Sequence, residues 1–250
     1  MRTDRENFLD VGFDALPVDA LIARIDAVDA DSPYEYLVTP NVDHVVRLHR
    51  QSSDLPELSS AYRDAAFCIC DSKVLARLAK WRGVELPVVT GSDLTALLFE
   101  KVLRKGDRIA IVGGDEALFG SLQAAFPDLE FVQHLPPMGL ARNAGARLAA
   151  AQFVAETKAR FTFICVGSPQ QELIAAEAAN LGDARGLALC VGAALEFLTD
   201  RQKRAPALAR QLGLEWAHRL LTNPRRLWRR YLVEGPAIFL LAYRWRRSAT

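Results

Sequence analysis

The chain has 250 residues, half of them apolar and 24% charged, with a formal net charge of +1. This length and apolar content allow a sizeable core, which excludes a disordered or fibrous protein and fits one large domain or one domain with an appendage. The charge is unevenly divided, because residues 201–250 carry 12 Lys or Arg and 2 acidic residues (net +10), whereas residues 1–200 carry 19 and 28 (net −9).

The N-terminal stretch MRTDRENFLD lacks a basic-then-apolar signal, and no run reaches the ~20 apolar residues of a membrane-spanning helix. We therefore expect a protein that stays in the cytoplasm. The cysteines occupy apolar strand-like runs, where a reduced thiol behaves as a small hydrophobe; they are Cys68, Cys70, Cys165 and Cys190. We expect Cys68 and Cys70 to point to opposite faces of a strand, and we predict no metal site and no cofactor.

Six short apolar runs alternate with helical patterns between residues 34 and 192. They are YEYLVT (34–39), AAFCIC (65–70), DRIAIVGG (107–114), LEFVQH (129–134), FTFICVG (161–167) and LALCVGA (187–193). Nearly continuous apolar strands are typical of a sheet that is covered on both faces. The pattern predicts an α/β fold over residues 1–200, with a Rossmann-like, mainly parallel sheet and helices on both faces.

Small, polar and acidic residues follow these runs, and ligands bind beyond the carboxyl ends of the strands in such sheets. The residues are Thr39 and Asn41 on either side of Pro40, Asp71 and Ser72, Gly113 to Asp115, Gly167 to Pro169, and Gly192. The opposite strand ends offer nothing comparable. We therefore predict that the carboxyl edge of the sheet carries the active site.

Asp71 directly follows the run AAFCIC, so its carboxylate is expected to emerge partly dehydrated at this edge. Partial burial raises the pKa of a carboxyl group and makes it a better general base. The alternative is a helix cap, because an Asp before SKVLARLAKW is a normal helix start, and spacing alone favours the cap. Asn41 has the same alternative before its own helix.

The turn IVGGDEALFG (111–120) places Gly113 and Gly114 between a strand and a helix, where backbone N–H groups can meet a phosphate. It lacks the G-x-G-x-x-G fingerprint and the P-loop lysine, and a tight turn that requires glycine explains it equally well. In VGSPQQE (166–172), Pro169 suits the first helical turn. Gln170, Gln171 and Glu172 are then predicted to reach a ligand such as a sugar or a base.

From about residue 207 the pattern is helical, with arginines between aromatic residues; the aromatic residues are Trp216, Trp228, Tyr231, Phe239, Tyr243 and Trp245. This mixture predicts an interfacial element on an anionic membrane, where each cation contributes about 1 kcal/mol. A solvated helix face, or core packing of AIFLLAY (237–243), is the alternative. A nucleic-acid site is disfavoured, because neither strand aromatics nor a recognition-helix motif is present.

Taken together, several motifs resemble the WecG/TagA/CpsF family of bacterial glycosyltransferases, glycosyltransferase family 26. The resemblance covers roughly residues 34–235. Its anchors are TPN (39–41), Asp71, VTGSDL (89–94), the IVGG turn, VGSPQQE (166–172), VGAALEF (191–197) and RAP with GLEWAHRLLTNPRRLWRRY (204–231). The order of G-x-P-x-Q-E, R-A-P and E-W-x-x-R-L-x-x-x-P-x-R-x-x-R-R is highly specific.

The resemblance implies inverting, metal-independent transfer of a sugar, in well-known members N-acetylmannosamine or its uronic acid, from a UDP-sugar. The acceptor would be a polyprenyl-diphosphate-linked sugar at the inner face of the cytoplasmic membrane, in cell-surface polysaccharide synthesis. By position, Asp71 matches the general base. Thr39, Asn41 and Gln171 match active-site polar residues, and the arginines proposed to close over the donor diphosphate match Arg219, Arg226 and Arg229.

Two features depart from many relatives: Ser72 replaces a glycine after the base, and no arginine precedes the VTG block. Both bear on donor or acceptor identity, which the sequence does not fix. The helical, arginine-rich residues 201–250 are predicted to be an appendage that serves membrane and substrate, and a homo-oligomer is compatible with the chain. A non-catalytic, membrane-associated nucleotide-binding or assembly subunit is the alternative function, and an oxidoreductase is disfavoured by the missing dinucleotide fingerprint.

Overall fold

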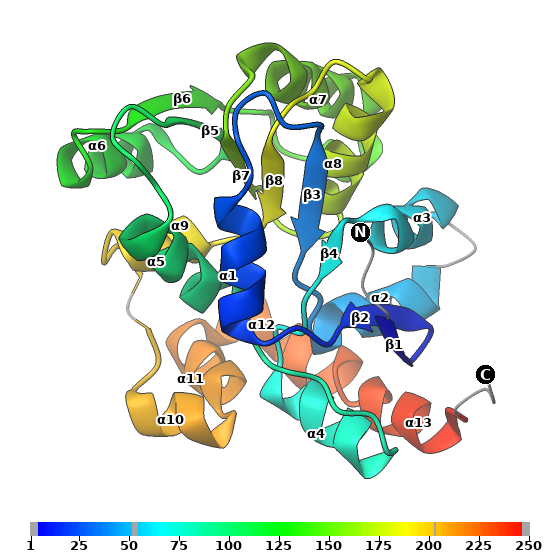
Figure 1. Cartoon of the computed structure of the whole chain (residues 1–250). Helices are drawn as coiled ribbons and strands as arrows, with labels where there is room; N and C mark the ends of the chain where they lie inside the picture. The colour runs from blue at the N-terminus through cyan, green and yellow to red at the C-terminus, as the bar shows by residue number, and fades with distance from the viewer. Residues whose placement is uncertain (1–4, 52–54, 203, 247–250) are drawn as a thin grey trace.

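The six predicted strands form one parallel sheet in the computed structural model. The structure describes residues 5–51, 55–202 and 204–246, and the side chains of residues 51, 141, 207 and 226 are not described. Its order is β4-β3-β8-β7-β5-β6 (Figure 1). The strands are β3 (Glu35–Val38), β4 (Phe67–Cys68), β5 (Arg108–Gly113), β6 (Glu130–His134), β7 (Phe161–Cys165) and β8 (Leu187–Cys190). The α/β prediction is confirmed.

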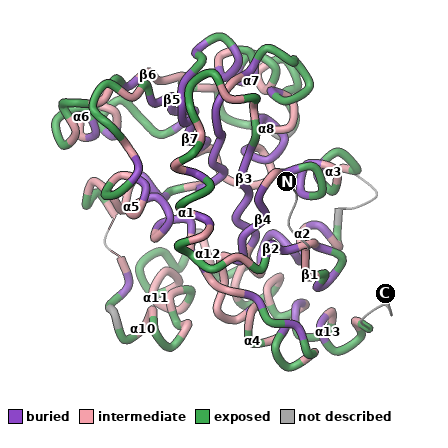
Figure 2. The backbone as a smooth tube through the Cα atoms, viewed as in Figure 1, coloured by how far each residue is buried: buried purple, intermediate pink, exposed green. Residues whose placement is uncertain are grey.

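Helices cover both faces of the sheet, and each face has its own apolar cluster. One cluster contains residues of α1 (Val18–Asp26), α5 (Gly91–Lys101), α6 (Glu116–Ala125) and α9 (Ala194–Leu198). The other contains residues of α2 (Val42–Gln51), α3 (Pro56–Asp64), α4 (Lys73–Trp81), α7 (Ala144–Thr157) and α8 (Gln170–Leu181). Figure 2 shows the buried strands at the centre and most of the exposed residues on the surrounding helices and loops.

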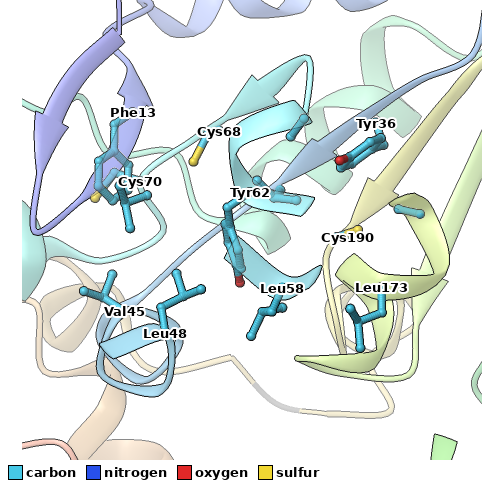
Figure 3. Packing of buried hydrophobic residues seen from close by; sticks show 14 of the residues in the cluster. Phe13, Tyr36, Val45, Leu48, Leu58, Tyr62, Cys68, Cys70, Leu173 and Cys190 are labelled. Carbon is cyan, nitrogen blue, oxygen red and sulfur yellow. The ribbon is translucent and has the colours of Figure 1, made fainter. Parts of the chain in front are cut away.

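Side chains alternate between the two clusters along each strand, as the period of two requires. Leu37 packs in the α1 and α5 cluster, whereas its neighbours Tyr36 and Val38 pack on the opposite face. Cys68 and Cys70 both lie in the second cluster (Figure 3). The expectation that these cysteines point to opposite faces is therefore wrong, because residues two apart on a strand share a face. Burial raises the pKa of the Cys68 thiol far above its usual value and that of Cys70 to about 12.

An N-terminal hairpin, β1 (Arg5–Phe8) and β2 (Val11–Asp14), was not predicted from the sequence. It extends the fold beside the edge strand β4, because the Asp14 carboxylate accepts a hydrogen bond from the Cys68 amide at 2.6 Å. The hairpin also meets the end of the chain, since the rings of Phe8 and Trp245 pack edge to face with centroids 5.1 Å apart. The two termini of the chain therefore share one side of the core.

The basic C-terminal residues form the predicted helices: α10 (Ala207–Leu212), α11 (Glu215–Thr222), α12 (Pro224–Trp228), a π-helical turn η2 (Arg229–Glu234) and α13 (Ala237–Arg244). They lie beyond the carboxyl ends of the strands (Figure 1). Ile238 and Ala242 of α13 are buried in the second cluster, whereas Phe239, Leu240 and Tyr243 are exposed. The segment 237–243 therefore packs on the core with one face and leaves an apolar face uncovered. None of the helices in the described ranges has the length and apolar content needed to cross a bilayer.

Candidate active site

The turn after β4 brings Asp71 to the carboxyl edge of the sheet. The Asp71 amide donates a hydrogen bond to the Pro40 carbonyl oxygen at 3.0 Å, which joins this turn to the Thr39–Asn41 turn. Ser72, not Asp71, caps α4: its side-chain oxygen accepts a hydrogen bond from the Leu75 amide at 3.2 Å. The cap alternative for Asp71 is therefore wrong, and its carboxylate is left for another role.

The capping role of Ser72 leads to a stability prediction. Replacing Ser72 by Ala should lower the free energy of unfolding by about 1 kcal/mol, because one amide at the start of α4 loses its acceptor. Ser72→Gly should cost only a few tenths of a kcal/mol. Urea unfolding of the two variants tests this, and equal stabilities of wild type and Ser72→Ala would contradict the cap.

Asp71 lines a cleft of about 640 Å³ between the sheet edge and the C-terminal helices. Asn41 and Thr90 belong to the wall on the sheet side, and Trp216 and Tyr231 belong to the opposite wall. The C-terminal helices also contribute three cations to the lining, which are Arg210, Arg219 and Arg230. The cleft therefore combines one carboxylate from a strand end with guanidinium groups from residues far away in the sequence.

The surroundings of Asp71 tune its acidity. Burial raises the pKa of this carboxyl group to about 7, against the opposing charge of Arg219 and a hydrogen bond with the Gly91 backbone. Gly91 begins α5, and the N-terminus of a helix favours a negative charge. A carboxyl group with a pKa near neutrality is half ionised at physiological pH, which is suited to accepting a proton from a substrate.

Thr39 and Asn41 hold the neighbouring turn. The Thr39 hydroxyl is buried and donates a hydrogen bond to the Cys190 carbonyl oxygen at 2.9 Å, which ties the ends of β3 and β8 together. The Asn41 side-chain oxygen accepts hydrogen bonds from the amides of Asp43 (3.0 Å) and His44 (3.4 Å), so Asn41 caps α2. Asn41 also lines the cleft, whereas Thr39 lies beneath it.

Gln171 and Glu172 lie behind the edge of the sheet instead of on it, with 2% and 0% of their surface exposed. The Gln171 amide nitrogen donates a hydrogen bond to Glu172 at 2.8 Å, and its oxygen accepts one from the Gly192 amide at 3.1 Å. These contacts turn both side chains inward and fix the end of β8. The structure thus gives them a supporting position, unlike the ligand contact that we expected for them.

Glu172 belongs to a buried polar group with His44 and Tyr62. The His44 Nδ1 atom lies 3.1 Å from the Tyr62 hydroxyl and 3.8 Å from the Glu172 carboxylate. Burial raises the pKa of Glu172; burial also lowers the pKa of His44 well below its usual value, and the charges of Arg230 and Arg47 add to that lowering. His44 is therefore neutral near pH 7, with its Nδ1 atom in contact with Tyr62.

The glycine turn lines a second cavity of about 680 Å³ at the same edge. Gly113 and Gly114 have φ of +95° and +74°, and an added Cβ would lie 2.7 Å from Val166 and from Leu118, respectively. Glycine is thus required by the turn itself, although the turn also faces open space. Asp115 caps α6 and pairs with Arg201 at 2.8 Å.

Gly167 and Gly192 lie in the turns after β7 and β8 and take part in hydrogen bonds through their backbone groups. Gly167 has φ of +77°, and its carbonyl oxygen accepts a hydrogen bond from the Gln171 amide at 3.0 Å, which helps to begin α8. Gly192 donates its amide to Gln171. Neither glycine lines the two cavities, so both shape the turns that carry other residues.

The predicted arginines occupy different places. Arg219 lines the cleft, pairs with Glu215 at 3.0 Å and stacks on Phe197 with its guanidinium carbon 5.3 Å from the ring centroid. Arg229 does not line the cleft; its side chain is 74% exposed and pairs with Glu234 at 3.1 Å. The side chain of Arg226 lies outside the described residues. Arg210 and Arg230 line the cleft but were not singled out from the sequence.

The cleft arginines have unsatisfied hydrogen-bonding capacity. Within the described part of the chain, the buried Nε atoms of Arg210, Arg219 and Arg230 have no hydrogen-bond partner. Because these Nε atoms are inaccessible, an anion in the cleft would contact the guanidinium groups through their terminal nitrogens, which can form paired hydrogen bonds with a phosphate. No group of three or more His, Cys, Asp or Glu that could hold a metal occurs in the same described ranges.

A family comparison agrees with this arrangement. The model of the glycosyl transferase WecG/TagA/CpsF family matches residues 6–250, nearly the whole chain. The chain belongs to this glycosyltransferase family. The match extends the resemblance found in residues 34–235 to the N-terminal hairpin and to the end of the C-terminal helices.

The acidity of Asp71 predicts a pH dependence for the glycosyltransferase. If the ionised carboxylate is the base, kcat/KM should rise about tenfold per pH unit below pH 7 and level off above about pH 8. The charge of Glu215 raises the pKa of Asp71, so Glu215→Gln should move the midpoint to lower pH. A pH profile of kcat/KM that is flat between about pH 5.5 and 8.5 would contradict this role.

Proposed function

We propose that the protein is an inverting, metal-independent glycosyltransferase that moves a sugar from a UDP-sugar to a polyprenyl-diphosphate-linked sugar. The sugar would be of the N-acetylmannosamine type or another hexose, and the product would serve bacterial cell-surface polysaccharide synthesis. One observation supports this most directly: Asp71, with its raised pKa, shares a cleft with three arginines of the C-terminal helices.

The proposed reaction uses these groups in one displacement. The Asp71 carboxylate accepts the proton of the acceptor hydroxyl while the hydroxyl oxygen forms a bond to the anomeric carbon. The bond between that carbon and the diphosphate oxygen breaks on the opposite face, and UDP leaves with the electron pair, which inverts the configuration. Guanidinium groups of Arg210, Arg219 and Arg230 would neutralise the charge that develops on the departing diphosphate.

The second cavity is a candidate site for the nucleoside. Gly113, Gly114 and the 135–140 loop provide a surface without lysine or arginine in its lining, which suits a neutral ring better than a diphosphate. Residues 201–210 connect the two cavities, because Arg201 pairs with Asp115 of the second cavity and Arg204 pairs with Asp93 of the first. A donor that occupies both cavities would lie near both ion pairs.

A transfer assay tests the proposal. Purified protein is incubated with UDP- and GDP-sugars and with polyprenyl-diphosphate-linked sugars, and donor consumption and the anomeric configuration of the product are measured. Transfer with inversion from a UDP-sugar supports the proposal. Binding of UDP-sugars without transfer to any acceptor supports the non-catalytic nucleotide-binding subunit instead, and retention of configuration contradicts the displacement.

The proposal includes peripheral binding at the inner face of the cytoplasmic membrane. Leu232 and Phe239 line the cleft and are also 56% and 58% exposed, so the mouth of the cleft adjoins the apolar surface of η2 and α13. Leu240 and Tyr243 of α13 are exposed as well, and so are Trp228 at the end of α12 and Arg229 at the start of η2. An anionic bilayer would cover this surface and bring a lipid-borne acceptor to the cleft.

Vesicle binding tests the membrane surface. Phe239→Ser and Trp228→Ser are expected to weaken sedimentation with phosphatidylcholine vesicles that contain phosphatidylglycerol, because exposed apolar area is removed. Met138→Ser is the matched control, since Met138 is 99% exposed beside the second cavity. Equal losses in all three variants, or binding that ignores the anionic lipid, would contradict the assignment.

A further inference from the structure

Asp43, in the first turn of α2, pairs with two arginines from different parts of the chain. Its carboxylate oxygen Oδ2 lies 2.7 Å from Arg47, one helical turn later, and 3.3 Å from Arg230 of η2. Asp43 is nearly buried and lines the cleft that contains Asp71. A single carboxylate therefore links the sheet domain to the C-terminal helices at the active-site edge.

Arg47 fixes the position of Asp43. One of its terminal nitrogens binds the Asp43 carboxylate, and the other donates to the Ser168 carbonyl oxygen in the turn before α8. Asp43 is also held through its backbone, because its amide donates to Asn41. The carboxylate thus has a fixed position with respect to the turns after β3 and β7, independently of the C-terminal helices.

Arg230, in contrast, reaches the cleft from η2 in the C-terminal helices. Its guanidinium lies over the ring of Tyr231, with the guanidinium carbon 5.6 Å from the centroid, and its buried Nε has no partner among the described residues. The ion pair with Asp43 is the contact that orients its terminal nitrogens. Because one carboxylate faces two guanidinium groups, the group keeps an excess positive charge that an anion can use.

We propose that Asp43 is a positioning residue that holds the Arg230 guanidinium at the mouth of the cleft in the geometry that receives a substrate diphosphate. This rests on the proposed function, which places the diphosphate among the cleft arginines. A guanidinium that is already held loses less conformational freedom when it binds an anion. Asp43 acts on the substrate only through Arg230, so the effects of the two residues should not be independent.

A double-mutant cycle on the full-length protein tests the coupling, with UDP as the probe and calorimetry as the measurement. Asp43→Asn is expected to weaken UDP binding about tenfold, and Arg230→Gln at least as much. The double variant should bind no more weakly than Arg230→Gln alone, because Asp43 has no role once Arg230 is removed. Asp43→Glu should restore part of the loss.

Two controls separate positioning from general stability. Glu234→Gln removes the other ion pair of η2, on the exposed side, and should leave UDP affinity unchanged. Arg47→Gln loosens Asp43 but keeps its charge beside Arg230, so it should weaken UDP binding by less than Asp43→Asn does. Hydrogen exchange over residues 229–244 should become faster in Asp43→Asn and stay at the wild-type rate in Glu234→Gln.

The outcomes distinguish the two proposals. If the losses from Asp43→Asn and Arg230→Gln multiply in the double variant, Asp43 acts by another route and the positioning role is overturned. If Asp43→Asn changes neither affinity nor exchange, the role is also overturned. If the wild-type protein does not bind UDP, the proposed function fails, and the exchange measurement alone then decides whether Asp43 holds η2.

Discussion

Replacing Asp71 by Asn is expected to reduce the transfer rate by roughly 10²- to 10⁴-fold, the usual contribution of a positioned general base. The asparagine has nearly the same shape but cannot accept the proton of the acceptor hydroxyl. UDP affinity should change little, because the cleft arginines remain in place. Rates under saturating donor and acceptor, with UDP affinity measured separately, give the result.

The same substitution should not destabilise the protein, which makes it a clean test. The pKa of Asp71 is raised from 3.8 to about 7 in the folded state, so the ionised carboxylate opposes folding above about pH 7. That penalty fades as the pH falls toward the unfolded value. At pH 8, Asp71→Asn should therefore be at least as stable as wild type, and full activity of a stable variant would refute the base.

The sheet and the gathering of polar residues at its carboxyl edge could be predicted from the sequence, because both follow from local patterns. Six apolar runs correspond to the six strands, and the polar residues after them meet at one edge, as the hydrogen bond between Asp71 and Pro40 shows. The hairpin of residues 5–14 was missed because RENFLDVGFD is short and rich in polar residues. Its strands are recognisable only from their packing beside β4.

The directions of individual side chains could not be predicted in this way. Gln171 and Glu172 start a helix at the edge, yet the carbonyl and amide groups at the end of β8 turn them inward. Ser72 caps the N-terminus of α4, although the Asp71 side chain could also accept a hydrogen bond from a helix amide. In both cases neighbouring residues compete for one role, and tertiary contacts decide between them.

The placement of the arginines depends on tertiary structure for a related reason. The helical face of α11 does not continue at one period, because the chain breaks at Asn223 and η2 is a π-helical turn closed by a hydrogen bond from the Gly235 amide to Arg230 at 2.8 Å. This geometry places Arg230 in the cleft lining and leaves Arg229 on the surface. π-Helical turns are common at functional sites, and here the turn selects which of two adjacent arginines lines the cleft.

Arg219 and Arg229 therefore allow the same substitution to be compared inside and outside the cleft. Arg219→Gln should lower kcat/KM by roughly 10²- to 10³-fold, because a donor aimed at the developing diphosphate charge is lost from a partly buried cleft. Arg229→Gln removes the same charge from an exposed ion pair, which contributes about 0–1 kcal/mol to stability. Its kcat/KM with a detergent-solubilised acceptor should stay within about twofold of wild type, because Arg229 does not line the cleft.

A detergent-solubilised acceptor separates a loss of catalysis in the cleft from a loss of membrane binding. On vesicles, either substitution reduces the attraction to anionic lipid, so a general loss of positive charge would lower both rates alike. In detergent only a group inside the cleft should matter. Arg219→Gln should also shift the pH midpoint upward, because the Arg219 charge lowers the pKa of Asp71. Equal losses for both variants in detergent, with no shift of the midpoint, would show that Arg219 does not act in the cleft.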